Sequence, residues 1–582
     1  MSKLFKTCAV IAIFLVSVRL GELSAQPQQA SGAEPPVPTI RVNTHLVLVD
    51  VVVTDKNGNR VQGLKAEDFT IQEKGKNQKI SVFTSAAENK LAAGPQLPPG
   101  IYSNKPEYRS PGGPVVVILL DAVNTPFKDQ AYARQQMLDF VKQQYKPGQK
   151  MAVLTLAGSL GVLQDFTQDP DVLLQALKNY KPQEQESTGT TIPRPPSTSS
   201  DGGINVQNSA FLMAQRIQGF QQVQVDYVED RRMQMTLEAM RGLGRFLGGI
   251  PGRKSVIWVT ATFPFNLIPE NRAVSDAELA ESLPTISQLG LGTRSTGAVA
   301  NTNRNLHTEE IRQAAAQLSS AQIAIYPVDA RGLITGMEGG MADLPARRFQ
   351  SMDDSALSKI SDVTASQEIM KEMARETGGI AYVNQNEIKN GVAVAVDDSN
   401  AYYTIGYYPE DKKWDGKYRS IKVKTSRDGT EARYRKGYFA IDPSELKDRK
   451  PDQEVGEALM DQTSATLVTF SAQIKPAAKG VGVDFLIDPK TISAEDAGSG
   501  KKINMVLYAA MFSPEGKMLG NKSMKVDQTF DAETYKKILQ QGMLLHIDLD
   551  TAVAPNNEVR LAVRDNRTGY VGTLSAPAVI KQ

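Results

Sequence analysis

The chain has 582 residues, of which 41% are hydrophobic and 22% are charged, a composition typical of soluble globular proteins. This length is too great for one hydrophobic core and predicts about three or four domains. The only cysteine is Cys8. Because it lies within the first 25 residues, a chain that loses them has neither disulfides nor a thiol for catalysis.

The first 25 residues have the pattern of a secretory signal peptide. Lys3 and Lys6 give a positive start, and an apolar run closed by Arg19 is too short to span a membrane. We therefore expect an exported protein, periplasmic or secreted, with no membrane span in the mature chain. Without these residues the 66 basic and 64 acidic residues become 63 of each. This zero net charge argues against nucleic acid as a partner.

Residues 26–39 are rich in Pro, Gln and Ala and are expected to be a disordered leader. Residues 40–88 contain short β-rich runs, which predict an N-terminal β-sandwich segment with a hairpin turn at Asn57-Gly58. The stretch from Ala86 to Gly113 is rich in Pro and Gly and is expected to be a linker.

Residues 110–398 alternate between strand and helix patterns. The run from Val115 to Leu120 is apolar without alternation, which predicts a strand buried on both faces of a parallel sheet. Gly158 predicts a tight hairpin that makes one edge of this sheet antiparallel. The pattern predicts a Rossmann-like, doubly wound α/β domain. It is interrupted by a low-complexity insertion at 183–207 and a polar region at 264–306.

Residues 400–441 return to a β pattern of three strands, of which Tyr418–Thr425 is the clearest. Three strands are too few to close a core, and so are those of residues 40–88. We expect the two segments to complete one sandwich into which the α/β domain is inserted. Residues 454–582, with strands such as Met543–Leu549, predict a separate C-terminal β-sandwich.

Six segments, taken together, carry a family resemblance. They are Val49–Phe83, Ile118–Thr125, Pro251–Pro264, Ile325–Leu333, Ala374–Ile388 and Tyr402–Ala440. In this order they resemble the von Willebrand factor A-related domain proteins of the acidobacterial type, over about residues 40–441. The resemblance implies an α/β von Willebrand A domain accompanied by β-sandwich segments, in an exported protein of a family mostly without assigned activity.

In von Willebrand A domains the first strand ends in D-x-S-x-S, part of a metal-ion-dependent adhesion site. Here Asp121 and Thr125 match this motif, but Val123 stands in place of the middle serine. Ala261 stands where another strand end carries an aspartate. Hard cations need several oxygen ligands, so we expect a degenerate site in which Asp121 caps the following turn. Asp121 and Thr125 remain the candidate ligands for Mg²⁺ or Ca²⁺.

Such a site also has a threonine ligand from a second loop. In this chain the candidates for that ligand are Thr188, Thr190 and Thr236. Asn124, Thr260, Thr262 and Asp329 are alternative sources of oxygen ligands. Arg331 is expected to form an ion pair with Asp121 or with Asp329.

Ligands of open α/β sheets bind outside the carboxyl ends of the strands. We therefore predict a binding rim made of Asp121, Asn124, Thr125, Thr260, Thr262 and Asp329.

The predicted function is that of an exported, non-catalytic, adhesion-type protein that binds another protein or an envelope component. A metal-assisted hydrolase or another envelope enzyme is the alternative. The three histidines, His45, His307 and His546, are far apart in sequence, and there is no G-x-S-x-G motif. These features favour the non-catalytic interpretation.

Overall fold

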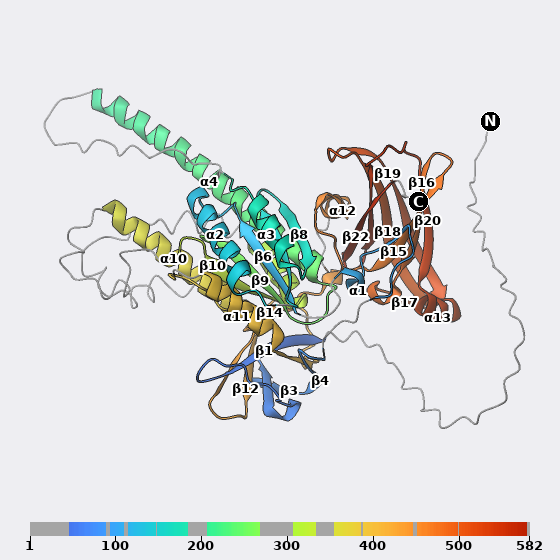
Figure 1. The fold of residues 1–582 in the computed structure, drawn as a ribbon, viewed down its shortest axis with the longest axis horizontal. Helices are drawn as coiled ribbons and strands as arrows, with labels where there is room; N and C mark the ends of the chain where they lie inside the picture. The colour runs from blue at the N-terminus through green and yellow to red at the C-terminus, as the bar shows by residue number, and fades with distance from the viewer. Residues whose placement is uncertain are drawn as a thin grey trace, which may run out of the picture. The chain divides into compact units, whose positions relative to one another are not determined.

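The computed structural model describes residues 46–88, 94–109, 114–146, 148–183, 206–267, 307–332, 354–385, 388–445, 451–498 and 500–578 (Figure 1). The predicted signal peptide and leader lie outside the described residues. So do residues 184–205 of the low-complexity insertion and residues 268–306 of the polar region.

A five-stranded sheet forms the centre of the α/β domain. Its strands are β6 (Val115–Asp121), β7 (Lys150–Leu156), β8 (Leu160–Thr167), β9 (Lys254–Thr260) and β10 (Ile323–Asp329), in the order β10-β9-β6-β7-β8. All neighbours are parallel except β7 and β8, which form the antiparallel edge. Every residue of β6, β9 and β10 is buried. The unbroken apolar runs therefore mark strands that are buried on both faces, as predicted.

Helices cover both faces of this sheet (Figure 1). On one face lie α2 (Phe127–Gln143), α3 (Pro170–Asn179) and α11 (Ile388–Asn400), and on the other α4 (Val206–Leu247), α8 (Thr308–Ser320) and α10 (Asp354–Thr377). Successive side chains of a strand point to opposite faces. Val115, Val117 and Leu119 accordingly belong to the core under α4 and α8, whereas Val116, Ile118 and Leu120 belong to the core under α2.

Two four-stranded sheets combine the β-rich segments on either side of the α/β domain. The first segment supplies β1 (Val47–Asp55), β2 (Phe69–Glu73), β3 (Lys76–Gln78) and β4 (Ile80–Ser85), with the short helix η1 (Ala66–Asp68). The second supplies β11 (Tyr403–Tyr407), β12 (Tyr418–Thr425), β13 (Thr430–Arg433) and β14 (Gly437–Phe439). The sheet orders are β13-β1-β11-β4 and β14-β12-β2-β3. Each sheet contains strands from both segments, and one hydrophobic cluster lies between the sheets.

The second segment has four strands where the sequence predicts three. Residues 430–433 pair with β1, whereas residues 437–439 pair with β12 in the other sheet. At Gly437 a Cβ atom would lie 2.4 Å from the backbone oxygen of Arg419. This close approach at the first residue of β14 leaves no room for a side chain.

Both predicted hairpin turns are present. Gly58 has φ +80° and Gly158 has φ +104°, backbone conformations that L side chains rarely adopt. Beside Gly58, the Asp55 carboxylate accepts hydrogen bonds from the backbone nitrogens of Asn57 and Asn59, at 2.8 and 2.9 Å. These local bonds are those of a tight turn.

The C-terminal part contains two further sheets around their own core. One consists of β20 (Met543–Leu549), β16 (Gly480–Ile487), β15 (Phe470–Ala477) and β5 (Ile101–Ser103), in that order. The other consists of β17 (Glu495–Ala497), β18 (Gly500–Phe512), β21 (Glu558–Asp565) and β22 (Val571–Pro577), with β19 (Met518–Asp531) paired to β18. The remaining helices of the described residues are α1 (Pro106–Arg109), η4 (Pro443–Glu445), α12 (Pro451–Met460), η5 (Pro489–Thr491) and α13 (Ala532–Gln541).

The stretch predicted to be a simple linker belongs in part to this C-terminal sandwich. Its strand β5 pairs with β15. Asn104 follows β5 and is fully buried. Its Nδ2 donates to the backbone oxygens of Ala465 and Val468 at 3.0 and 2.9 Å, and its Oδ1 accepts from the Phe470 nitrogen at 2.8 Å. A three-residue strand is too short to be recognised in a sequence, which explains the wrong prediction.

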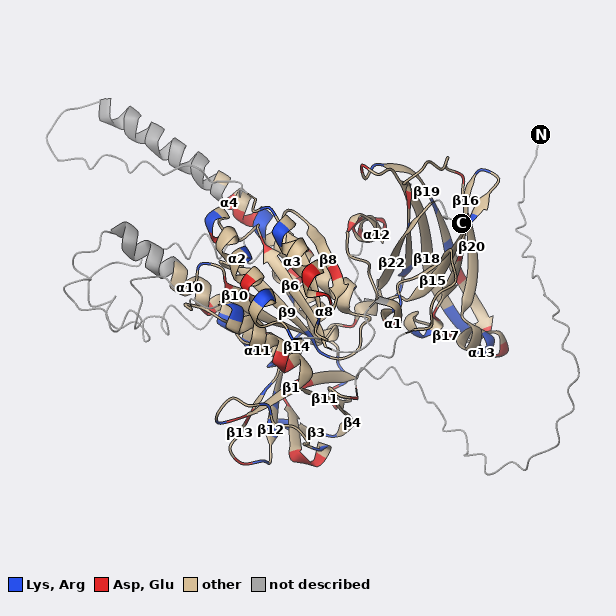
Figure 2. Ribbon diagram, in the orientation of Figure 1, with Lys and Arg blue, Asp and Glu red and all other residues tan. Residues whose placement is uncertain are grey.

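Basic and acidic residues are both distributed over the α/β domain and the sandwiches (Figure 2). This mixture agrees with the near balance of charges in the sequence. In the described part of the chain, no helix combines the length and the apolar character that crossing a membrane requires.

Candidate functional site at the strand ends of the α/β sheet

Asp121 ends the central strand β6 and is almost completely buried. Its Oδ1 accepts a hydrogen bond from the Asn124 backbone nitrogen at 2.9 Å. Its Oδ2 accepts from Nδ2 of Asn124 and from Nε1 of Trp258, both at 2.9 Å. Burial raises the pKa of Asp121 above its ordinary value, although these hydrogen bonds oppose the shift. As the sequence predicts, Asp121 caps the turn that follows it.

Asn124 connects this turn to helix α4. Its Nδ2 also donates to Oγ1 of Thr236 at 2.9 Å. Thr236 is fully buried, and its hydroxyl donates to the Arg232 backbone oxygen at 2.8 Å. The structure therefore brings Thr236 to the Asp121 turn, whereas Thr188 and Thr190 lie outside the described residues.

The hydroxyl groups near Asp121 join two loops. Oγ1 of Thr125 accepts a hydrogen bond from the Ala261 backbone nitrogen at 3.2 Å. Oγ1 of Thr260 donates to the backbone oxygen of Thr262 at 2.7 Å. Thr125 and Thr260 are buried, and Thr262 is half-buried. These groups stabilise the loops after β6 and β9.

Asp329, at the end of β10, is also buried. Arg331 binds it in a bidentate manner, through Nε at 2.8 Å and Nη2 at 2.9 Å. Gln367 of α10 donates to it at 3.2 Å. Of the two ion pairs that the sequence leaves open for Arg331, the structure has the one with Asp329.

The donor set at Asp121 does not fit a hard divalent cation. Mg²⁺ and Ca²⁺ bind through oxygen atoms, but N–H groups point at both carboxylate oxygens of Asp121. Val123 supplies no side-chain oxygen, and Oγ1 of Thr125 accepts the Ala261 N–H. No group of three or more His, Cys, Asp and Glu residues suited to a metal occurs among the described residues.

Phe127 is an exposed residue that the predicted rim omits. It is the first residue of α2, directly after the Asp121 turn, and 49% of its surface is exposed. Lys128 beside it is exposed as well. By the 3.6-residue repeat Phe127 is in line with the buried Leu138 and Val141, so it is exposed because it lies in the first turn of α2. Its spacing is that of a core residue, and the sequence pattern therefore gives no signal that it is exposed.

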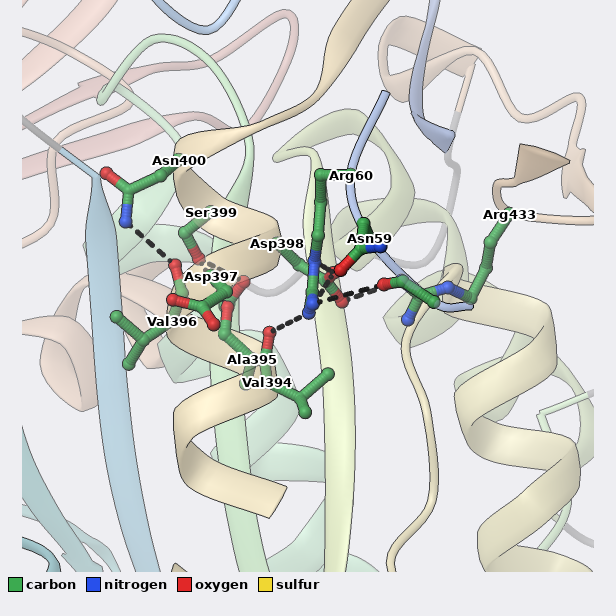
Figure 3. Close-up of polar contacts among 12 residues, drawn as sticks. Asn59, Arg60, Val394, Ala395, Val396, Asp397, Asp398, Ser399, Asn400 and Arg433 are labelled. Carbon is green, nitrogen blue, oxygen red and sulfur yellow. Dashed lines mark hydrogen bonds and ion pairs between the residues drawn. The ribbon is translucent and has the colours of Figure 1, made fainter. Parts of the chain in front are cut away.

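A second buried polar cluster joins α11 to the first sandwich (Figure 3). Asp398 accepts hydrogen bonds from Nε and Nη2 of Arg60, at 3.2 and 3.0 Å, and forms an ion pair with Nη2 of Arg433 at 2.8 Å. The hydroxyl of Tyr326 also donates to it, at 2.8 Å. Each carboxylate oxygen has partners, so the cluster is an anchor and not a reactive site.

Three tyrosines of the second β segment are packing residues. Tyr403, Tyr407 and Tyr438 are buried. The hydroxyls of Tyr407 and Tyr438 donate to Glu73 at 2.8 and 2.9 Å, and Tyr403 packs against Phe69 and Phe83.

No family model matches the chain, and no curated protein matches it. Among solved structures it is similar to an aerotolerance-related membrane protein from Bacteroides fragilis, with 14% identity, 50% of this chain and 98% of that chain covered, and a TM-score of 0.22. It is similar to a von Willebrand factor type A protein from Catenulispora acidiphila, with 9% identity, 88% and 73% covered, and a TM-score of 0.21.

A third similar structure is the pilus adhesin SpaC from Lactobacillus rhamnosus GG, with 7% identity, 90% of this chain and 62% of that chain covered, and a TM-score of 0.23. TM-scores of this size do not establish a shared fold. The α/β domain is defined by its own strand order and strand directions.

Proposed function

We propose that the chain is an exported, non-catalytic protein that binds another protein or an envelope component through the strand ends of a von Willebrand A-related domain. The proposed rim comprises Asp121, Asn124, Thr125, Thr260, Thr262 and Asp329, with Phe127 added from the structure. Support comes from the signal-peptide pattern, the sequence resemblance and the sheet order with one antiparallel edge.

One observation carries the proposal. The carboxylate of Asp121 is held by three internal N–H donors, and that of Asp329 is held by Arg331. Buried groups engaged in this way keep a surface rigid and offer no reactive carboxylate. The partner then contacts the exposed side chains above them, above all Phe127, through shape and hydrogen bonds. A shared metal ion is not needed. Rigid scaffolds with exposed loop residues are common carriers of recognition.

Site-specific photo-crosslinking tests this function. A photoreactive amino acid is placed at Phe127 in the mature chain, and the chain is incubated with the envelope fraction of the producing cells. Leu544, which is 70% exposed on the C-terminal sandwich, is the matched control position. We expect one defined crosslinked partner from position 127 and none from position 544. EDTA should leave the yield of crosslinked product unchanged. Unlabelled parent chain should compete for the partner, whereas unlabelled chain that carries Phe127→Ala should not. Equal crosslinking from both positions, or loss with EDTA, would contradict the proposal.

A further inference from the structure

His307 lies directly before α8 and is only 9% exposed. Its Nε2 is 2.6 Å from Oδ1 of Asp230 on α4, and its Nδ1 contacts Oε2 of Glu310 on α8. An ionised carboxylate only accepts hydrogen bonds. Both ring nitrogens must therefore carry protons to satisfy both partners, and the ring in this arrangement is an imidazolium ion.

This cluster lies at the same end of the sheet as the proposed rim. Helices α4 and α8 precede the parallel strands β9 and β10, so they run antiparallel to the strands and their N-terminal parts lie at the carboxyl ends. Asp230 precedes Thr236 on α4 by about 9 Å along the helix axis. Thr236 accepts the amide of Asn124. The same helix thus carries the His307 contact and a contact to the Asp121 turn.

We propose that His307 is a pH-sensitive latch that joins α4 to α8 and regulates binding at the rim, an inference that rests on the proposed function. Neutral imidazole has a single N–H. Because His307 directly precedes α8, only its contact with Asp230 joins the two helices. After deprotonation this contact is lost when the remaining proton stays on Nδ1, beside Glu310. The latch is closed while the ring is charged and opens as the pH rises.

The local electrostatics agree with this direction. Burial alone would lower the pKa of His307, but hydrogen bonds and charges from Asp230 and Glu310 outweigh it and raise the pKa above the ordinary value. Two carboxylates face the ring, Asp230 from α4 and Glu310 from α8. Because the folded-state pKa is raised, the contribution to stability is complete below the unfolded pKa of about 6.5 and is lost as pH rises through the folded pKa.

His546 is a matched control within the same chain. Its Nδ1 is 2.6 Å from Asp484, and its Nε2 is 3.0 Å from Asp548. It also faces two carboxylates but is half exposed. It belongs to β20, which is paired along its length with β16. Deprotonation of His546 therefore leaves the arrangement of its strands unchanged.

The test uses amide hydrogen exchange on the full mature chain at about pH 6 and about pH 9, corrected for intrinsic exchange. We expect protection of residues 226–240 and 308–320 to fall about tenfold at the higher pH. His307→Gln should show low protection at both pH values, and His307→Lys, with a permanent charge, should remove the pH dependence. His546→Gln should behave like the parent chain. A pH dependence that persists in His307→Gln would overturn the latch.

Photo-crosslinking from position 127 then separates the latch from its role in binding. We expect the yield to change between the two pH values in the parent chain but not in His307→Lys. If exchange follows the prediction while crosslinking occurs equally at both pH values, the regulatory role is wrong. If no crosslink forms at any pH, the proposed rim function fails, and the exchange data still decide whether the latch exists.

Discussion

The indole nitrogen of Trp258 donates a 2.9 Å hydrogen bond to the carboxylate of Asp121. Trp258 lies on β9, next to the strand that Asp121 ends, and is fully buried. The bond occupies a carboxylate oxygen that an adhesion-type site would offer to a cation. The side-chain nitrogen of Asn124 donates to the same oxygen of Asp121, and the backbone nitrogen of Asn124 donates to the other oxygen. The position that defines the metal site in the resembled family is here part of the hydrogen-bonded core.

Removing the Asp121 carboxylate should therefore destabilise the α/β domain. Asp121→Ala leaves the N–H groups of Trp258 and Asn124 without their acceptor, and a buried unpaired donor costs about 1–3 kcal/mol. We expect the free energy of unfolding, measured with urea, to fall by about 2–4 kcal/mol. Asp121→Asn retains one acceptor oxygen and should lose less. An unchanged unfolding midpoint for Asp121→Ala would show that these hydrogen bonds do not stabilise the domain.

Divalent cations should have no effect on stability. A ligand that binds only the native state must raise the melting temperature. Because N–H groups surround the Asp121 carboxylate, we expect the same Tm with Mg²⁺, with Ca²⁺ and with EDTA in differential scanning calorimetry. A Tm that rises with Mg²⁺ or Ca²⁺ in the parent chain but not in Asp121→Asn would show that Asp121 belongs to a metal site.

The buried Lys254 should make stability depend on alkaline pH. Burial lowers its pKa to about 7, although the charge of Asp50 opposes the shift. Its Nζ donates to the Ile250 backbone oxygen at 2.7 Å. Between pH 7 and about 10.5 the unfolded chain holds this proton and the folded chain does not. The free energy of unfolding should rise with pH in this window, by at most about 1.4 kcal/mol per unit. Lys254→Met should lack this slope, and equal slopes in both proteins would refute the assignment.

Asn104 should stabilise the C-terminal sandwich from a distant part of the chain. Asn104→Ala removes the partners of three backbone groups, at Ala465, Val468 and Phe470. We expect a loss of about 2–4 kcal/mol and faster amide exchange in β15. Lys105→Ala, one residue further on, is the control and should change little. Normal exchange in β15 of the Asn104 variant would mean that β5 is dispensable.

The ion pairs of Asp398 should contribute far more to stability than the ion pair of the adjacent Asp397. Asp398→Asn leaves Arg60 and Arg433 without a buried counter-charge, and breaking a buried pair costs about 3–5 kcal/mol. Asp397 is 38% exposed and pairs with an exposed Lys146, so Asp397→Asn should cost less than about 1 kcal/mol. Urea unfolding of both variants measures the difference. Similar losses would show that burial is not what distinguishes them.

Local sequence patterns predicted many elements correctly. The strands Tyr418–Thr425 and Met543–Leu549 have the predicted bounds, because alternation of buried and exposed residues is written in neighbouring positions. Helix α11 was not predicted. Its VAVAV run alternates like a strand, yet Val392, Ala395 and Val396 pack as one helical face in the core under α2. Packing overrides local propensity at such positions.

That Asp121 ends a buried strand follows from local sequence, because an unbroken apolar run and its terminal carboxylate are adjacent in the chain. The partners of this carboxylate depend on how distant elements pack. Trp258 and Thr236 are 137 and 112 residues from the groups they contact, Asp121 and Asn124. Which side chains meet across such distances depends on how helices and strands pack, and no local pattern encodes it. For the same reason Asn104 and His307 acquired their partners only in the folded chain.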